Sequence, residues 1–225
     1  MQTPKANGNN TINVLIVDDH EIMRQGLTQL INQETDMIVC AEAEDAAGAL
    51  DAMSEHQPNI AVVDISLKDS SGIELIKDIM VRWPGFPVLV LSMHEESFYA
   101  ERVLRAGAKG YVSKAEVSSK VVDGIRTVLK GDLYVSEKLA SKLLSGIVGG
   151  SAPEVSPIDR LSDREFEVFE MIGRGQQMRD IASKLHLSVK TVEAHREHIK
   201  KKLNLDSANE LLTYALQWAQ LERDA

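Results

Sequence analysis

The chain has 225 residues, of which 44% are hydrophobic, 26% are charged and only 4% are aromatic. This length allows two compact domains with cores of their own, and the low aromatic content argues against a stacking platform for single-stranded nucleic acid. The polar start of the chain, the lack of an apolar run of about 20 residues and a lone cysteine, Cys40, favour a cytoplasmic protein without membrane insertion or internal disulfides.

The net charge of −9 is unevenly distributed along the chain. Residues 1–159 carry 14 basic and 23 acidic side chains, whereas residues 160–225 carry 11 of each. Between Lys184 and Lys202 there are six Lys and Arg residues and only two acidic ones. Such a basic stripe is typical of a small nucleic-acid reader attached to an acidic domain, although a solvated helix face has the same composition.

Five apolar runs alternate with amphipathic segments through residues 12–131, as in a parallel sheet built from βαβ units. The predicted strands span residues 12–17, 37–42, 59–64, 87–92 and 109–113. The predicted helices span residues 20–33, 45–56, 72–82, 95–106 and 116–130. We therefore expect a doubly wound, five-stranded α/β domain over residues 12–131.

A stretch rich in Gly, Ser and Pro, from Gly149 to Pro157, breaks both the helix and the strand pattern. We expect a linker over residues 132–159, with a short helix at 136–146.

Residues 160–225 have a wholly helical pattern, which predicts a small all-α domain. Its four helices are expected over residues 162–173, 177–184, 188–203 and 207–220. Ser162 and Glu165 have the spacing of a capping box, so we assign Glu165 a structural role.

Charged and hydroxyl side chains stand at the ends of four predicted strands, and the carboxyl ends of parallel strands meet at one edge of a sheet. Asp18 and Asp19 follow the first strand, Asp64 ends the third, Ser92 ends the fourth and Lys114 follows the fifth. Crowded carboxylates repel one another, so this set predicts a site for a cation or a phosphoryl group.

Aspartate can accept a phosphoryl group as a nucleophile when Mg²⁺ neutralises charge, and Mg²⁺ prefers one or two carboxylates together with water. We therefore assign Asp64 as the phosphoryl acceptor, and Asp18 and Asp19 as further ligands of Mg²⁺ or Mn²⁺. Ser92 and Lys114 are expected to contact the phosphoryl oxygens. A lone strand-end aspartate is more commonly a helix cap, but that explanation does not extend to four strand ends.

Residues 177–203 have helix-turn-helix spacing, and Ser188 is placed to cap the second helix. An apolar-leaning stripe of this helix is expected to pack inward, and it comprises Val192, His195, Ile199 and Leu203. The opposite face is left for the major groove of DNA. Core packing is the ordinary explanation for any amphipathic helix, and for His195 we prefer it to a ligand role.

Several motifs of the first domain resemble the receiver domain of bacterial two-component response regulators. They are Val17 to His20, Val62 to Ile65, Leu91 to Met93 and Ala106 to Lys114. The resemblance implies that Asp64 takes its phosphate from a histidine kinase.

The same resemblance implies roles for the surroundings of Asp64. The backbone carbonyl of Ser66 completes the metal shell, Ser92 moves toward the phosphoryl group and Tyr111 turns inward as part of the switch. The side chains of Ser66 and His94 are expected to set how long the phosphate lasts.

The second domain resembles the LuxR-type output domain in Leu161 to Glu165, Gly175, Asp180 to Ala182 and Leu187 to His195. The whole chain thus resembles a NarL/FixJ-type response regulator. By this resemblance the base-reading positions are Glu193, Ala194 and Glu197, and the DNA-backbone contacts are Arg179, Lys190, Thr191 and Lys201.

The resemblance implies a transcription regulator rather than an enzyme. It is expected to homodimerise when phosphorylated and to bind double-stranded promoter DNA, with RNA polymerase as a further candidate partner.

Two alternatives stay open. A Mg²⁺-dependent phosphohydrolase could use Asp64 as its nucleophile, but such enzymes of the haloacid dehalogenase type carry a second aspartate where this chain has Ser66. A DNA-binding regulator could also use its receiver without phosphate, as an interaction module, which the intact acidic site disfavours.

Overall fold

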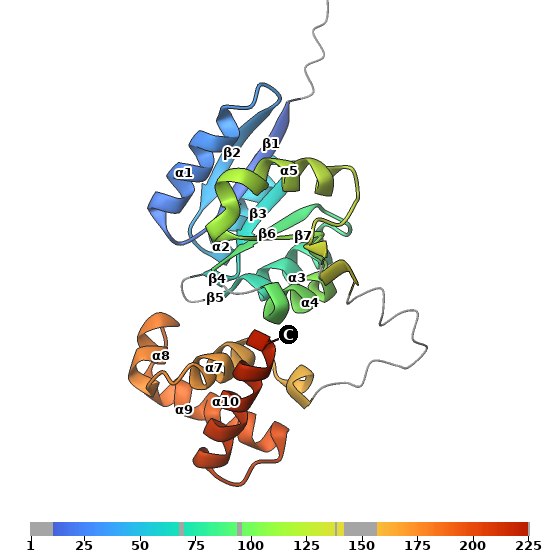
Figure 1. Ribbon diagram of the computed structural model, residues 1–225. Coiled ribbons are helices and arrows are strands. Elements are labelled where there is room, and N and C mark those ends of the chain that lie inside the picture. Colours follow the sequence, from blue (N-terminus) through green and yellow to red (C-terminus); the bar gives the residue numbers. More distant parts are fainter. Residues whose placement is uncertain (1–10, 68–69, 94–95, 138, 142–156, 225) are drawn as a thin grey trace, which may run out of the picture.

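The computed structural model describes residues 11–67, 70–93, 96–137, 139–141 and 157–224. Figure 1 shows an α/β domain above a smaller helical domain, and we call them the sheet domain and the helical domain. Within the described ranges, no helix is long and apolar enough to cross a membrane.

The sheet domain is built on five parallel strands in the order β2-β1-β3-β6-β7. The strands are β1 (Ile12–Val17), β2 (Met37–Ala43), β3 (Ile60–Asp64), β6 (Val88–Ser92) and β7 (Gly110–Ser113). The strand order reverses between β1 and β3, which is where doubly wound sheets bind their ligands. The predicted fold class is confirmed for this domain.

Helices cover both faces of the sheet because successive strand residues point to opposite sides. In β1, Val14 and Ile16 join the apolar cluster under α1 (Glu21–Asn32) and α5 (Val117–Leu129). Leu15 and Val17 join the other cluster. That face is covered by α2 (Ala46–His56), α3 (Gly72–Arg82) and α4 (Glu96–Ala106).

Two short strands were not predicted. β4 (Ser66–Leu67) and β5 (Ser70–Ser71) pair in antiparallel fashion directly after β3. Each strand is only two residues long, which is too short for an alternating pattern that could indicate a strand.

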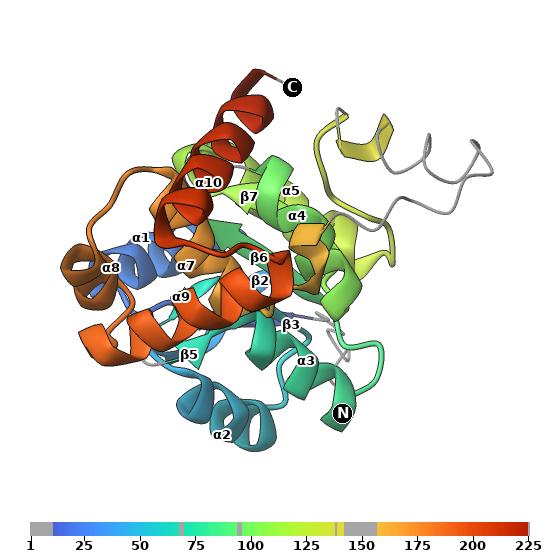
Figure 2. The ribbon, with the colours of Figure 1, turned by 90° about the horizontal axis from the view of Figure 1, so that it is seen from below.

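The helical domain begins with the 3₁₀ turn η2 (Pro157–Arg160) and then has the four predicted helices. They are α7 (Asp163–Gly173), α8 (Met178–Lys184), α9 (Val189–Leu203) and α10 (Ala208–Asp224). The predicted capping box is present, because Ser162 and Glu165 each accept from the other's backbone N–H. Seen from below in Figure 2, α9 lies in front of α7, on the side turned away from the sheet.

Part of the predicted linker lies outside the described residues. Residues 137 and 139–141 are helical, in agreement with the start of the helix expected at 136–146. Positions 138 and 142–156, which include the Gly, Ser and Pro-rich stretch, are among those not described.

Candidate functional site

Three charged side chains from different strand ends meet at the carboxyl edge of the sheet. Asp18 follows β1, Asp64 ends β3, and Lys114 begins the 3₁₀ turn η1 (Lys114–Glu116) directly after β7. The Nζ atom of Lys114 lies 2.6 Å from Oδ2 of Asp18 and 2.6 Å from Oδ2 of Asp64. All three residues are buried, with Asp18 wholly inaccessible. The structure thus brings these sequence-predicted residues into direct contact.

Asp19 and His20 stand beside this set. Nδ1 of His20 lies 2.8 Å from Oδ1 of Asp19 and 3.3 Å from Oδ1 of Asp18. One potential ligand atom from each of Asp18, Asp19, His20 and Asp64 falls within 4.8 Å of all the others. Sequence analysis did not single out His20, although its position next to two expected metal ligands was an available signal.

The arrangement has the properties of a divalent-cation site. Oδ2 of Asp18 and Oδ1 of Asp19 are buried and accept no well-directed hydrogen bond, even though Nζ of Lys114 lies 2.6 Å from the first and Nδ1 of His20 lies 2.8 Å from the second. Asp18 and Asp64 share the one ammonium group of Lys114, with the carboxylate of Asp19 beside them, so the strand ends carry an excess of negative charge. Clustered carboxylate oxygens suit hard ions such as Mg²⁺ and Mn²⁺, so the residues fit the expected cofactor.

The electrostatics of Asp64 reflect the same excess of negative charge. Burial raises the pKa of Asp64 to about 6, opposed by Lys114 and reinforced by Asp18. A backbone hydrogen bond from Ser66 also favours the ionised form. Burial alone would lower the pKa of Lys114, but Asp64 and Asp18 raise it above its ordinary value. A bound divalent cation would further favour ionised Asp64, which is the nucleophilic form.

Gly72 holds the segment after Asp64 close to the strand end. Its N–H donates to the carbonyl of Ile65 at 2.7 Å, and a Cβ at this position would lie 2.0 Å from the carbonyl oxygen of Asp64. Only glycine allows this close approach of helix α3 to the end of β3. Sequence analysis missed Gly72, and the available signal was a glycine at the start of a predicted helix.

The other residues expected near the phosphoryl group differ in how they are placed. Ser92 ends β6 beside Ser113 of β7 and is wholly buried. Tyr111 is already buried in the sheet domain, with 3% of its surface exposed. His94 lies outside the described residues, so its expected role in phosphate lifetime stays a prediction.

The helix-turn-helix is formed by α8 and α9. Ser188 caps α9 by accepting from the N–H of Thr191 at 3.0 Å, and the turn has His186 at φ +51°. Val192 and Ile199, on the inner face of α9, are wholly buried. His195 is half-buried, and burial together with Arg164 lowers its pKa, which fits the packing role that we preferred.

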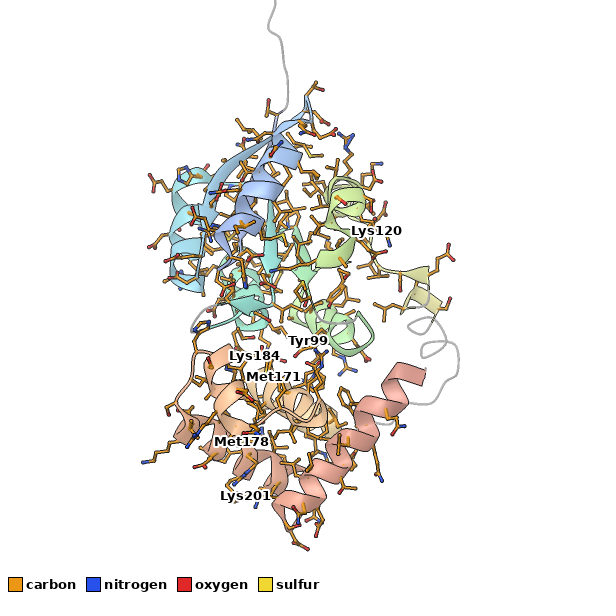
Figure 3. The ribbon with its side chains drawn as sticks, turned by 60° about the vertical axis from the view of Figure 1, so that its left-hand side comes forward. Tyr99, Lys120, Met171, Met178, Lys184 and Lys201 are labelled. Atoms are coloured by element: carbon orange, nitrogen blue, oxygen red, sulfur yellow. The ribbon has the colours of Figure 1, made fainter. Side chains whose placement is uncertain are left out.

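The outer face of α9, together with Arg179 at the start of α8, carries the residues expected to contact DNA. Those assigned to bases and to phosphates are all exposed, namely Glu193, Ala194, Glu197, Arg179, Lys190, Thr191 and Lys201. Oε2 of Glu197 lies 2.8 Å from Nζ of Lys200, and this hydrogen bond lowers the pKa of Glu197. Figure 3 places Lys201 on the side of the helical domain that faces away from the sheet domain.

Comparison with known families agrees with both halves of the structure. Residues 14–126 match the family described as response regulator receiver domain. Residues 159–215 match bacterial regulatory proteins of the luxR family.

Similar proteins match along nearly the whole chain. The oxygen regulatory protein NreC of Staphylococcus epidermidis is 39% identical over 215 residues, covering 93% of this chain and 99% of that protein. NreC of Staphylococcus carnosus is 36% identical over 209 residues, covering 91% and 96%.

A solved relative is RcsB of Salmonella enterica serovar Typhimurium, bound to promoter rprA in the presence of the phosphomimetic BeF₃⁻. It is 27% identical, with a TM-score of 0.59, over 92% of this chain and 98% of that one. The chain therefore belongs to the two-component response regulators of the NarL family, which are transcription regulators and not enzymes, and it joins a receiver domain to a LuxR-type helix-turn-helix output domain.

Proposed function

We propose that Asp64 accepts a phosphoryl group from a histidine kinase, and that the phosphorylated protein dimerises and binds paired sites in promoter DNA through α9. The observation that carries this proposal is the buried contact of Lys114 with both Asp18 and Asp64, at 2.6 Å each. A buried nucleophile, clustered metal-ligand oxygens and a lysine in reach of both are the parts that phosphoryl transfer to aspartate needs.

The residues of the site have different roles in the proposed phosphoryl transfer. Asp18, Asp19, Asp64 and the carbonyl of Ser66 would hold Mg²⁺ or Mn²⁺, which supplies positive charge for the negatively charged acceptor and phosphoryl group. A carboxylate oxygen of Asp64 attacks phosphorus, and the bond from phosphorus to the imidazole nitrogen of the kinase breaks.

After the transfer Asp64 no longer presents a free carboxylate to Lys114. Lys114 then pairs with a phosphoryl oxygen, and the hydroxyl of Ser92 donates to another. Tyr111 takes part in the switch, and Ser66 and His94 set the phosphate lifetime. Charge-assisted hydrogen bonds of about 1.5–3 kcal/mol each are enough to shift a two-state equilibrium by one or two decades.

In the output domain we propose that base edges are read by Glu193, Ala194 and Glu197. Glutamate accepts from the amino group of cytosine, so the preferred sites should contain cytosine opposite these positions. Phosphates are contacted by Arg179, Lys190, Thr191 and Lys201. Glutamates weaken nonspecific attraction to DNA, so affinity should depend on pairing of two protomers.

Two solved structures of the similar protein RcsB support this proposal. RcsB was solved with promoter DNA and a phosphomimetic, and also as two dimers bound to two parallel DNAs. A histidine kinase is the partner implied by the receiver, and RNA polymerase is proposed as a partner at the promoter.

Phosphodonor labelling tests the acceptor assignment. Acetyl phosphate with Mg²⁺ should add one acid-labile phosphoryl group, detected by intact mass, and Asp64→Asn should abolish the addition. Asp51→Asn, which removes an exposed carboxylate of α2, is the matched control and should label as the wild type does. Undiminished labelling of Asp64→Asn would refute the assignment.

A further inference from the structure

His20 precedes α1 and directly follows the two carboxylates at the end of β1, but its side chain does not cap the helix. The cap position is usually filled by Ser, Thr, Asp or Asn, whose short side chain accepts from the first turn. The imidazole of His20 forms no such hydrogen bond to α1, all of which the structure describes, and it lies instead against Asp18 and Asp19. The start of the helix therefore does not account for the position of this ring.

His20 contacts the strand-end carboxylates through both its backbone and its ring. Its N–H donates to Oδ1 of Asp18 at 2.9 Å. Its Nδ1 atom lies 2.8 Å from Oδ1 of Asp19 and 3.3 Å from Oδ1 of Asp18. One residue thus fixes a carboxylate through the main chain and adds a nitrogen atom to the same cluster through the side chain.

The approach of Nδ1 to Asp19 has the spacing of shared ligation and lacks the geometry of a hydrogen bond. Oδ1 of Asp19 is buried and accepts no well-directed hydrogen bond from any described residue, although Nδ1 of His20 is 2.8 Å away. Ligand atoms about 2.1 Å from an octahedral ion and at right angles to each other lie about 3 Å apart. The separations of 2.8 and 3.3 Å are therefore those of neighbouring ligand atoms around one ion.

A donor set of carboxylate oxygens and one imidazole nitrogen does not suit all divalent ions equally. Mg²⁺ is a hard ion that is bound mostly through carboxylates, phosphates and water. Imidazole suits first-row transition ions, whose affinity for a mixed nitrogen and oxygen site rises from Mn²⁺ toward Cu²⁺. An imidazole beside Asp18, Asp19 and Asp64 should therefore strengthen binding of a transition ion more than binding of Mg²⁺.

The ring of His20 lies on the open side of the cluster. The side chain of His20 is 69% exposed, whereas those of Asp18 and Asp64 are 0% and 3% exposed. An exposed side chain changes rotamer readily. The ring can therefore move aside for an ion that takes oxygen ligands only, so it does not exclude Mg²⁺.

We propose that Nδ1 of His20 is a ligand of the divalent cation at the strand ends, and that it gives the site a preference for Mn²⁺ and later first-row transition ions over Mg²⁺. This inference rests on the metal site of the proposed function and specifies the class of ion. A neutral imidazole that binds an ion through Nδ1 carries its proton on Nε2. Asp18 and Asp64 hold any divalent cation, whereas His20 determines which one is preferred.

The test measures metal binding by the full-length protein without phosphodonor, at one fixed pH. The electron paramagnetic resonance signal of free Mn²⁺ gives the Kd of Mn²⁺, and displacement of bound Mn²⁺ by Mg²⁺ gives that of Mg²⁺. Pulsed measurements on bound Mn²⁺ detect a coupled nitrogen nucleus where imidazole is a ligand.

His20→Asn is the test variant, because asparagine is itself a good residue at a helix cap. The matched control is His56→Asn, which changes an exposed histidine at the end of α2. His56 precedes β3 and so lies toward the opposite end of that strand from Asp64. Far-UV circular dichroism verifies that each variant is folded.

The wild type and His56→Asn should show the nitrogen coupling, and His20→Asn should lose it. His20→Asn should weaken Mn²⁺ binding roughly tenfold or more and leave the Kd of Mg²⁺ within about twofold, because only the transition ion gains from imidazole. Asp18→Asn should weaken the binding of both ions, since its carboxylate is a ligand of either.

Three results would overturn the inference. One is Mn²⁺ bound without a coupled nitrogen, or with a coupling that persists in His20→Asn. Another is an equal change, or no change, in the affinities for Mn²⁺ and Mg²⁺ in His20→Asn, which would leave His20 at most a positioning residue for Asp19. The third is a wild type that does not bind Mn²⁺.

The outcome is independent of phosphoryl transfer. No phosphodonor is present, so failure of Asp64 to be labelled would leave the nitrogen coupling and the preference for Mn²⁺ intact. Absence of the nitrogen coupling would equally leave the labelling prediction intact. The two failures are therefore distinguishable.

Discussion

The molecule has two groups of three carboxylates, one at the strand ends and one on α7, and they are compensated very differently. At the strand ends, Asp18 and Asp64 share Lys114 with Asp19 beside them, and buried oxygens of Asp18 and Asp19 lack a directed hydrogen bond. On α7, each of Asp163, Glu167 and Glu170 has a lysine or arginine within 2.8 Å as well as a donor from the receiver or a second cation.

The comparison separates a site that needs a ligand from an interface that is complete without one. Buried charge without compensation is costly, and a protein keeps it where a cation or a reacting group will be bound. Buried carboxylates that are each paired with a cation, as on α7, instead hold the surfaces of the two domains in a fixed relative position. We therefore expect the clustered carboxylates of the receiver to take part in the chemistry of the site, and the paired carboxylates of α7 to stabilise the contact between the domains.

Removing the shared cation should have the largest effect. Lys114→Met leaves Asp18 and Asp64 buried without it, and we expect a loss of about 3–5 kcal/mol in the free energy of unfolding at pH 7 in metal-free buffer. Urea titration measures this loss. Lys130→Met, at an exposed lysine, should cost less than about 0.5 kcal/mol. Equal effects of the two substitutions would mean that the strand-end charges are not in excess.

Removing the negative charge of Asp64 should instead increase the free energy of unfolding. Asp64→Asn should stabilise the metal-free protein by roughly 1–3 kcal/mol at pH 7, since each unit by which burial raises the pKa of Asp64 costs about 1.4 kcal/mol. The gain should shrink as pH falls below 6, where the folded wild type takes up a proton, and vanish near 3.8 and below, where the unfolded chain is protonated too. Denaturation at several pH values measures it, and a destabilised Asp64→Asn at pH 7 would count against the comparison.

Adding a divalent cation distinguishes the two sets directly. Mg²⁺ at ten times its Kd should raise the free energy of unfolding by about 1.4 kcal/mol. Asp18→Asn should weaken this response, whereas Asp163→Asn on α7 should leave it intact. Thermal melts with Mg²⁺ or with chelator measure the response, and its loss in Asp163→Asn would place the cation elsewhere.

The smallest effect is expected at the start of α7. Burial would raise the pKa of Glu165, but its bonds to Lys202 and Ser162 outweigh burial and lower it. Glu165→Gln should cost about 1 kcal/mol at pH 7 through the weakened capping box. Because the folded pKa is depressed, this difference should disappear as pH falls below the ordinary value of 4.5. A cost that is independent of pH would show that the charge of Glu165 is unimportant.

Sequence reasoning reached the receiver sheet, the four output helices and the residues of the acidic cluster because each has a local signal. Strand ends place Asp18, Asp64 and Lys114 at one edge whatever surrounds them. Tyr99 and Arg102 of α4, which contact the output domain, have no such signal, because they lie in an ordinary amphipathic helix. Their contacts are with residues some 60–70 positions further along the sequence. His20 and Gly72 did have a local signal, a position beside two expected metal ligands and a position at the start of a predicted helix, but their contacts became evident only from the packing around them.

The most direct test of the account is the affinity of the full-length protein for its selected duplex with and without acetyl phosphate and Mg²⁺, in the wild type and in Asp64→Asn. We predict that phosphodonor tightens binding of the wild type at least tenfold, with two protomers per paired site, and leaves Asp64→Asn unchanged. Equal affinity and stoichiometry of the treated and untreated wild type would contradict control of DNA binding by the strand-end site.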